Sequence, residues 1–174
     1  QAGGTITVTT NNLTIDASQN FTISGGTFNL NDAILDVSKA FTLSDGTFNG
    51  DTGTVNVTTT FTVSGGTFNA PPLLNIDDDF TVSAPSSFVH NDNTVQFNAT
   101  NNAYDIIADG VTFYDVTFSK TGGGAGNMDI EGSFIVENDL SYENSVSSGG
   151  YAVSSTSPQI ITVYGDILFP TGGG

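Results

Sequence analysis

The stretch FTISGGTFN at residues 21–29 returns twice along the chain, as FTLSDGTFN from Phe41 and FTVSGGTFN from Phe61. A degraded fourth copy, FTVSAPSSF, begins at Phe80. The copies lie 20, 20 and 19 residues apart. A motif that returns at a fixed period of this length is typical of stacked repeats, in which each unit buries its apolar face against the next.

Each copy is consistent with one coil of three short strands. Residues 21–24 alternate apolar and hydroxyl side chains, as a strand with one buried face does. Gly25-Gly26 supplies the first turn, where a positive φ favours glycine. The rest of the coil repeats this pattern, with a second strand at 27–30, a turn at 31–32, a third strand holding Leu35 and Val37, and a closing turn at 38–40.

Stacked coils about 4.8 Å apart bring equivalent side chains into columns. Four core columns are expected: Phe21, Phe41, Phe61 and Phe80; Phe28, Phe48, Phe68 and Phe88; Ile23, Leu43, Val63 and Val82; and Val37, Val57 and Ile76. An antiparallel sandwich or barrel also has short strands and glycine turns, but does not require identical side chains every 20 residues. The sequence therefore predicts an all-β parallel β-helix, or β-solenoid, with coils of about 20 residues. No segment has a helical period, so no helical cap is expected.

The regularity of the repeat changes along the chain. Residues 1–139 are predicted to form the solenoid, regular over 13–88 and irregular over 89–139. Residues 140–174 contain isolated apolar strands at 160–164 and 167–169, and they are interpreted as a cap or an inter-subunit segment.

The charge balance argues against several function classes. Eighteen acidic residues stand against two lysines, for a net charge of −16. Phosphate backbones and anionic lipids would be repelled, so we expect no nucleic-acid partner and no membrane insertion. The chain has no cysteine or arginine, and His90 is its one imidazole, interpreted as an exposed turn residue. We therefore expect no catalytic residues and no enzyme. A polysaccharide-active β-helix enzyme using carboxylates of Asp77-Asp78-Asp79 is a lesser alternative.

Two kinds of ligand or modification site are conceivable. Oxygen-rich acidic turns suit calcium, and the candidate ligands are Asp77, Asp78, Asp79 and Asp92. No EF-hand or calcium-solenoid spacing accompanies them, so a solvated acidic turn is the simpler interpretation and no cofactor is expected. Four positions match the N-glycosylation acceptor pattern, namely Asn12, Asn20, Asn56 and Asn98.

Two stretches carry a resemblance to a known class of protein. NTVQFN at residues 93–98 and GVTFYDVTF at residues 110–118 resemble a recurring unit of large secreted prokaryotic surface proteins with tandem β-solenoid repeats. Val116 stands where that unit usually has leucine. The FTxSGGTF copies resemble the same class, and the likeness spans about residues 13–137. This resemblance implies an extracellular or cell-surface role, as in an adhesin, sheath or filament.

The ends of the predicted solenoid suggest how it would work. Solenoids usually blunt their terminal strand edges with caps, and this sequence shows none. We therefore expect an extracellular, self-assembling filament or surface fibre, a homopolymer joined by edge stacking or strand exchange. The alternative is a stalk or binding segment of a monomeric cell-surface adhesin that contacts glycans or surfaces.

Overall fold

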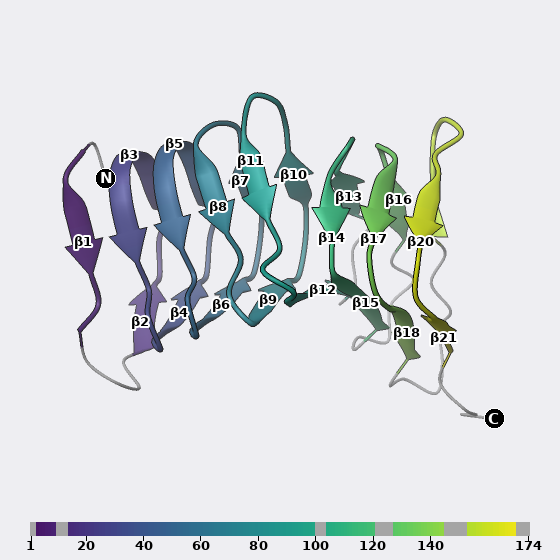
Figure 1. The fold of residues 1–174 in the computed structure, drawn as a ribbon, viewed down its shortest axis with the longest axis horizontal. Coiled ribbons are helices and arrows are strands. Elements are labelled where there is room, and N and C mark those ends of the chain that lie inside the picture. The colour runs from purple at the N-terminus through teal and green to yellow at the C-terminus, as the bar shows by residue number, and fades with distance from the viewer. Residues whose placement is uncertain (1–2, 10–13, 100–103, 121–126, 145–152, 170–174) are drawn as a thin grey trace.

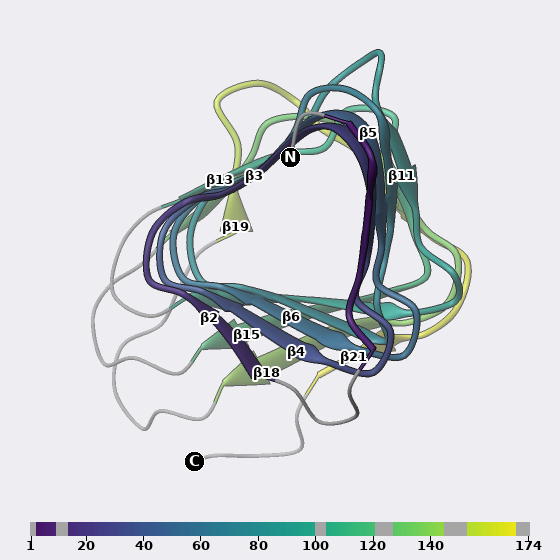
Figure 2. The same ribbon diagram turned by 90° about the vertical axis from the view of Figure 1, so that its left-hand side faces the viewer.

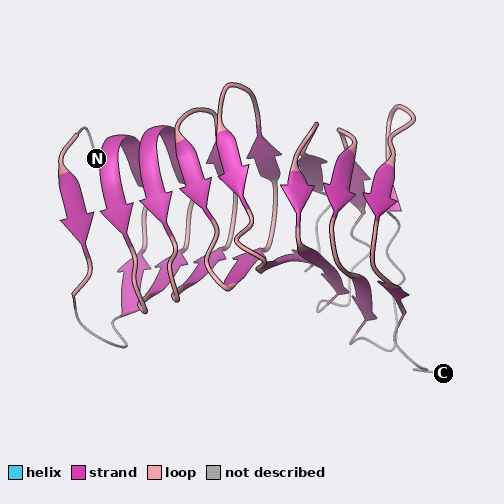
Figure 3. Cartoon of the chain, in the orientation of Figure 1, coloured by secondary structure: helices cyan, strands magenta, loops and turns pink. Residues whose placement is uncertain are grey.

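The computed structural model describes residues 3–9, 14–99, 104–120, 127–144 and 153–169. Their regular structure is entirely strand and turn, without a helix (Figure 3). The strands stack along one axis into a parallel solenoid (Figure 1). Viewed along that axis, the coils enclose a triangular cross-section (Figure 2). The predicted fold class is confirmed.

The three sides of the triangle are called faces A, C and B, in the order in which each coil visits them. Face A holds the first halves of β3 (Phe21–Asn29) and β5 (Phe41–Asn49), then β7 (Phe61–Val63), β10 (Phe80–Val82), β13 (Tyr104–Ile107), β16 (Met128–Ile130) and β19 (Val153–Ser154). Face C holds β1 (Thr5–Thr7), the second halves of β3 and β5, then β8 (Thr67–Asn69), β11 (Ser87–Val89), β14 (Thr112–Phe113), β17 (Phe134–Val136) and β20 (Ile161–Val163). Face B holds β2 (Thr14–Ala17), β4 (Ile34–Val37), β6 (Thr54–Val57), β9 (Leu73–Ile76), β12 (Thr94–Ala99), β15 (Asp115–Lys120), β18 (Leu140–Asn144) and β21 (Ile167–Leu168).

Two columns of phenylalanine rings form the centre of the first coils. Face A pairs Phe21 with Phe41, Phe41 with Phe61, and Phe61 with Phe80. Face C pairs Phe28, Phe48, Phe68 and Phe88 in the same way. Rings within a column are stacked 4.9–5.7 Å apart. Rings of different columns meet edge to face, as Phe61 and Phe68 do at 5.0 Å. Burial of each ring contributes about 2 kcal/mol to stability.

A column of aliphatic side chains follows the face A rings two residues further along each strand. Ile23 pairs with Leu43, and Leu43 pairs with Val63. Val63 then pairs with Val82. All four side chains are buried, Leu43 and Val63 completely. The column on face B has the same form, since Val37 pairs with Val57 and Val57 with Ile76.

The corner that follows Leu43 differs from the one that the sequence predicted. Gly25-Gly26 was expected to form a turn between two separate strands, but β3 and β5 each continue around this corner as one strand of nine residues. The pairing stays parallel and shifts register at the corner, so that Ser24 pairs with Asp45 and not with Ser44. Glycines at positive φ bend the strand there, as in a β-bulge, without ending the ladder.

The stack continues where the repeat fades from the sequence. Ile106 follows Phe80 in the face A register. In these coils the rings that meet Phe80 and one another come from the other two faces. These rings are Phe97, Phe113, Phe118 and Phe134. The sheets also run on across residue 139, since β18 pairs with β15 on one side and with β21 on the other. Strands after residue 140 therefore belong to the same three faces.

Outward-facing amides form a further set of columns. On face C, Asn69 donates to Asn49 at 2.7 Å and Asn49 donates to Asn29 at 2.6 Å. On face B, Asn75 donates to Asn56 at 2.7 Å and Asn56 donates to Asp36 at 2.6 Å. Each such hydrogen bond joins one coil to the next and contributes about 1 kcal/mol.

Close stacking of the corners between faces A and C requires glycine. Gly66 has a φ of 72°, and a Cβ built on it would lie 2.3 Å from the carbonyl oxygen of Gly46 in the preceding coil. Gly110 occupies the same kind of corner two coils later, with a φ of 73°. A Cβ built on Gly110 meets nothing within 4 Å. The two glycines therefore differ in surroundings but not in backbone conformation.

Gly66→Ala is expected to destabilise the protein much more than Gly110→Ala. Both substitutions place a Cβ at positive φ, which costs about 1–2 kcal/mol. Gly66→Ala adds a clash with backbone, for a total of about 3–4 kcal/mol. Urea denaturation followed by circular dichroism measures both values. Equal losses would show that the corners do not stack as closely as described.

Candidate functional site

The four candidate calcium ligands do not come together. Asp77, Asp78 and Asp79 lie at the corner between faces B and A, whereas Asp92 lies at the corner between faces C and B. The Asp77 carboxylate accepts a hydrogen bond from the Asn98 amide at 2.9 Å. The described part of the chain holds no group of three or more histidines and carboxylates arranged for a metal ion. The structure places these four residues at two different corners, so calcium binding by them stays a prediction.

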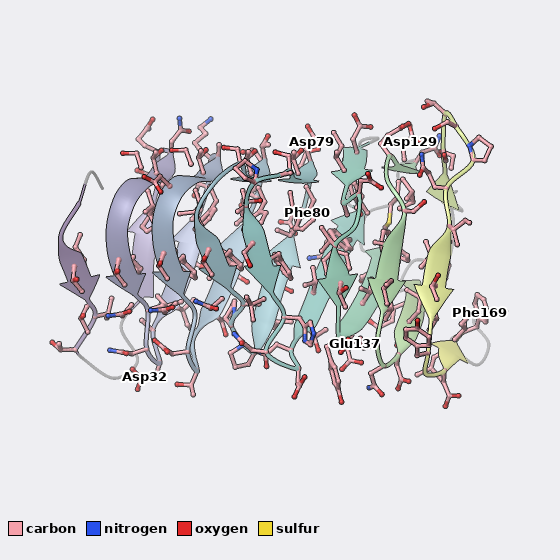
Figure 4. The ribbon with its side chains drawn as sticks, turned by 45° about the horizontal axis from the view of Figure 1, so that its top comes forward. Asp32, Asp79, Phe80, Asp129, Glu137 and Phe169 are labelled. Atoms are coloured by element: carbon pink, nitrogen blue, oxygen red, sulfur yellow. The ribbon has the colours of Figure 1, made fainter. Side chains whose placement is uncertain are left out.

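Asp79 instead begins an acidic column on the outside of face A. Its Oδ1 accepts a hydrogen bond from the backbone N–H of Asp105 at 3.0 Å. Asp105 is paired in register with Asp129, so three carboxylates follow one another along the stack. Asp79 and Asp129 lie along the same edge in Figure 4. Asp129 in turn accepts a hydrogen bond from Ser154.

Burial and neighbouring carboxylates disfavour the charged form of two carboxyls, Asp105 in the column and Asp78 beside it. Burial, followed by the charges of Asp79, Asp129 and Glu131, raises the pKa of Asp105 above its usual 3.8. Burial and the neighbouring Asp79 raise the pKa of Asp78 in the same way. Carboxyls with raised pKa values stabilise the fold when protonated, at low pH, and this stabilisation is lost as the pH rises through their folded pKa values.

The melting temperature is therefore expected to rise as the pH falls from neutral towards 4. Asp105→Asn removes one of the repelling charges, so it should raise the melting temperature at pH 7.5 and flatten the pH dependence. Glu143→Gln, which removes an exposed charge on face B beside Ser119 and outside the column, is the control. Differential scanning fluorimetry across pH 4–8 measures all three proteins. An Asp105→Asn profile parallel to that of the unmodified chain would contradict the expected coupling.

His90 is more enclosed than the sequence interpretation supposed. Its side chain is 21% exposed and lies between two carboxylates, with Nε2 3.3 Å from Glu137 and Nδ1 3.6 Å from Asp92. Nδ1 accepts the backbone N–H of Asp92 at 3.0 Å, and the ring stacks on Tyr114 at 5.9 Å. The imidazole therefore links the corners of successive coils between faces C and B.

The acceptor-pattern asparagines lie in different surroundings. Asn20 is exposed at a corner, where its Oδ1 accepts the N–H of Ala40 at 3.4 Å. Asn56 donates its amide within the face B column, and Asn98 donates its amide to Asp77. Asn12 lies outside the described residues. Since a glycan is attached through the side-chain nitrogen, Asn20 is the described position where attachment would break no amide hydrogen bond seen in the structure.

The strongest unpartnered surface is the C-terminal end of the stack. Five of the nine exposed large apolar residues in the described part of the chain lie in the last coil, namely Ile160, Tyr164, Ile167, Leu168 and Phe169. Ile167 follows Leu140 in register, so it faces inward, yet it is 56% exposed. The ring of Phe169 lies 6.0 Å from Tyr142 and is 70% exposed (Figure 4). The columns of core side chains therefore extend to this end of the stack, where no further described coil covers them.

The N-terminal end is open in a similar way. Phe21, the first ring of its column, is half-buried, whereas Phe41 and Phe61 are fully buried. Ile6 of β1 stacks on Phe28 in register and is 48% exposed. Sequence reasoning anticipated open strand edges, but not that apolar core residues would lie bare beside them.

Comparisons with known proteins return no relative. No family model, no curated protein and no solved structure matches the chain. Among the described residues there is no helix long and apolar enough to cross a membrane. The geometry of the surfaces therefore carries the functional argument.

Proposed function

We propose that the chain is a structural subunit of an extracellular filament or surface fibre, joined end to end to copies of itself. One observation carries the proposal: among the described residues, apolar core columns run out uncovered at both ends of the stack, beside open sheet edges. Ile6 and Phe21 mark one end, and Ile167 and Phe169 mark the other. Uncovered core and unpaired edges are both stabilised by a further coil.

The two ends match on faces B and C. At the C-terminal end the last described strands are β19 on face A, β20 on face C and β21 on face B. At the N-terminal end the first strands on faces C and B are β1 and β2, whereas the first described strand on face A, the first half of β3, belongs to the next coil. All pairing in the stack is parallel, so β21 of one copy meets β2 of the next in the orientation that β18 and β21 already use. Such a head-to-tail contact is heterologous and propagates without closing.

Two properties favour edge stacking over lateral association. The net charge of −16 repels parallel fibres from one another, whereas the ends present apolar side chains. Exchange of a terminal strand between copies would use the same edges. The resemblance of residues 13–137 to secreted surface repeats supports an extracellular location.

Electron microscopy of the purified 174-residue chain tests the proposal. Face B contributes eight strands per copy, and strands about 4.8 Å apart give an axial repeat of about 38 Å. We expect uniform unbranched fibres with that repeat, forming faster at higher salt because screening weakens charge repulsion. Monodisperse rods at all salt and protein concentrations would favour the second candidate, a segment of a monomeric adhesin. That candidate is supported by the cleft described next.

A further inference from the structure

Face C is interrupted between β11 and β14. Strands β14, β17 and β20 form a sheet of their own, and β11 pairs only with β8. A cleft of about 300 Å³ opens at this interruption. Strands β11 and β14 lie in the middle of the stack, away from both ends (Figure 1). The residues that line the cleft and carry the argument are Ser83, Ser87, Phe88, Asp109, Gly110 and Thr112.

The cleft opens because the corner between faces A and C in the β10 coil lacks the glycines that allow close stacking of coils. On face A the β10 and β13 coils are joined by the pairs Phe80–Ile106 and Thr81–Ile107, and the two chains separate after these pairs. In the preceding coil the corner contains Gly65-Gly66, where a Cβ built on either glycine would lie 2.2–2.3 Å from a carbonyl oxygen of the β5 coil. In the β10 coil the corner contains Ala84-Pro85, whose proline ring also removes a backbone donor. The open space beside Gly110 is the consequence.

Both sides of the cleft present backbone groups. Ser87 donates to Gly66, and Val89 accepts from Ala70, so both residues bond towards the preceding coil. In a parallel strand the intervening residue points its N–H and C=O to the opposite side, which places those of Phe88 on the cleft.

The same alternation applies across the cleft. The carbonyls of Val111 and Phe113 accept from Ile135 and Glu137 in the following coil. The N–H and C=O of Thr112 therefore face back towards β11. The two strands that border the cleft are not joined to each other by a ladder.

Side chains add hydroxyls, a carboxylate and an aromatic surface. Ser83, Ser87 and Thr112 bring hydroxyls, and Asp109 is exposed at the rim. Phe88 is half-buried although Phe48 and Phe68 in its column are fully buried, so its ring is accessible through the interruption.

These groups suit a neutral polyhydroxylated ligand. Each sugar hydroxyl both donates and accepts, as the facing backbone and serine groups require. An anion would be repelled by Asp109 and by the net charge of −16. The volume is at the lower limit of small-molecule sites, which span about 300–1,000 Å³, and suits one or two sugar rings. We propose that the cleft between β11 and β14 is a saccharide-binding site. This proposal is independent of the filament, because the cleft lies on the side of the stack.

Saturation-transfer NMR tests the site, and it works equally for single subunits and for fibres. The probes are the methyl glycosides of glucose, mannose and galactose, N-acetylglucosamine, and a β-1,4-linked glucose disaccharide. We expect saturable transfer to at least one of them with a dissociation constant on the order of 1–10 mM, as befits a small ligand. Absence of saturable transfer to every probe would overturn the proposal and leave the cleft a hydrated break in the sheet.

Variants locate the binding. Thr112→Val and Asp109→Ala each remove a polar partner and are expected to weaken binding about fivefold or more. Ser87→Phe fills the cleft and is expected to abolish binding. Thr52→Val makes the same chemical change as Thr112→Val in a different polar cleft, beside Asp32 and Asp51, and is expected to leave binding unchanged. Transfer that survives Ser87→Phe, or that Thr52→Val removes equally, would place the ligand elsewhere and overturn the assignment.

Discussion

Phe169→Asp is expected to abolish fibre formation while leaving the coils folded. Phe169 is 70% exposed in a single copy, so the substitution removes little packing from the subunit. In the proposed fibre the same position is covered by the first coil of the next copy. A carboxylate there would be buried without a cationic partner, which costs several kcal/mol. Electron microscopy and light scattering measure assembly, and circular dichroism measures the fold.

Val89→Asp is the matched control for Phe169→Asp. Val89 is an exposed apolar residue on the side of the stack, 37% exposed, and the substitution adds the same charge. Fibres should persist in Val89→Asp. Loss of fibres in both variants would show that added charge alone prevents assembly, and fibres in Phe169→Asp would show that the C-terminal coil is not the joining surface.

Phe61→Ala is expected to lower the free energy of unfolding by about 3–5 kcal/mol. Phe61 is fully buried, stacks on Phe41 at 5.0 Å and on Phe80 at 5.2 Å, and meets Phe68 edge to face at 5.0 Å. Its loss opens a cavity that weakens the contacts to the coils on both sides. Urea denaturation measures the change.

Two further variants make the Phe61 result interpretable. Phe21→Ala removes the same side chain from the same column, but Phe21 is half-buried, so the expected loss is about half as large. If Phe61→Ala does not fold, Phe61→Leu keeps most of the volume and is expected to cost about 1.5 kcal/mol. Equal losses in Phe21→Ala and Phe61→Ala would contradict the role of stacking from both sides.

The first coils were predictable because the same type of residue occupies the equivalent position in each successive coil. Phe21, Phe41 and Phe61 return at a constant spacing, so the register could be read from the sequence. The later coils break this rule. Phe80 is followed in its column by Ile106, 26 residues on, and Phe134 is followed by Ile161, 27 residues on. Unequal corner lengths hide the period, although the inward positions stay apolar.

The surfaces were less predictable than the core. Residues 160–169 read as isolated strands because the residues that precede them in the stack, around Phe134 and Leu140, are distant in sequence. The cleft depends on a pairing that fails to form, and the one local signal is Ala84-Pro85 where earlier coils carry glycine. The outward carboxylates of Asp105 and Asp129 meet only because their strands share a register.

The interruption of face C has a mechanical consequence. Hydrogen bonds between coils point along the axis of the stack, so a pulling force along that axis loads all the bonds of one interface together. At the interface between the β10 and β13 coils only faces A and B are laddered, and the face A ladder has two residue pairs. Under tension the ladders of faces A and B carry the whole load at this interface, so the two coils are expected to tilt apart on face C, where no ladder joins them.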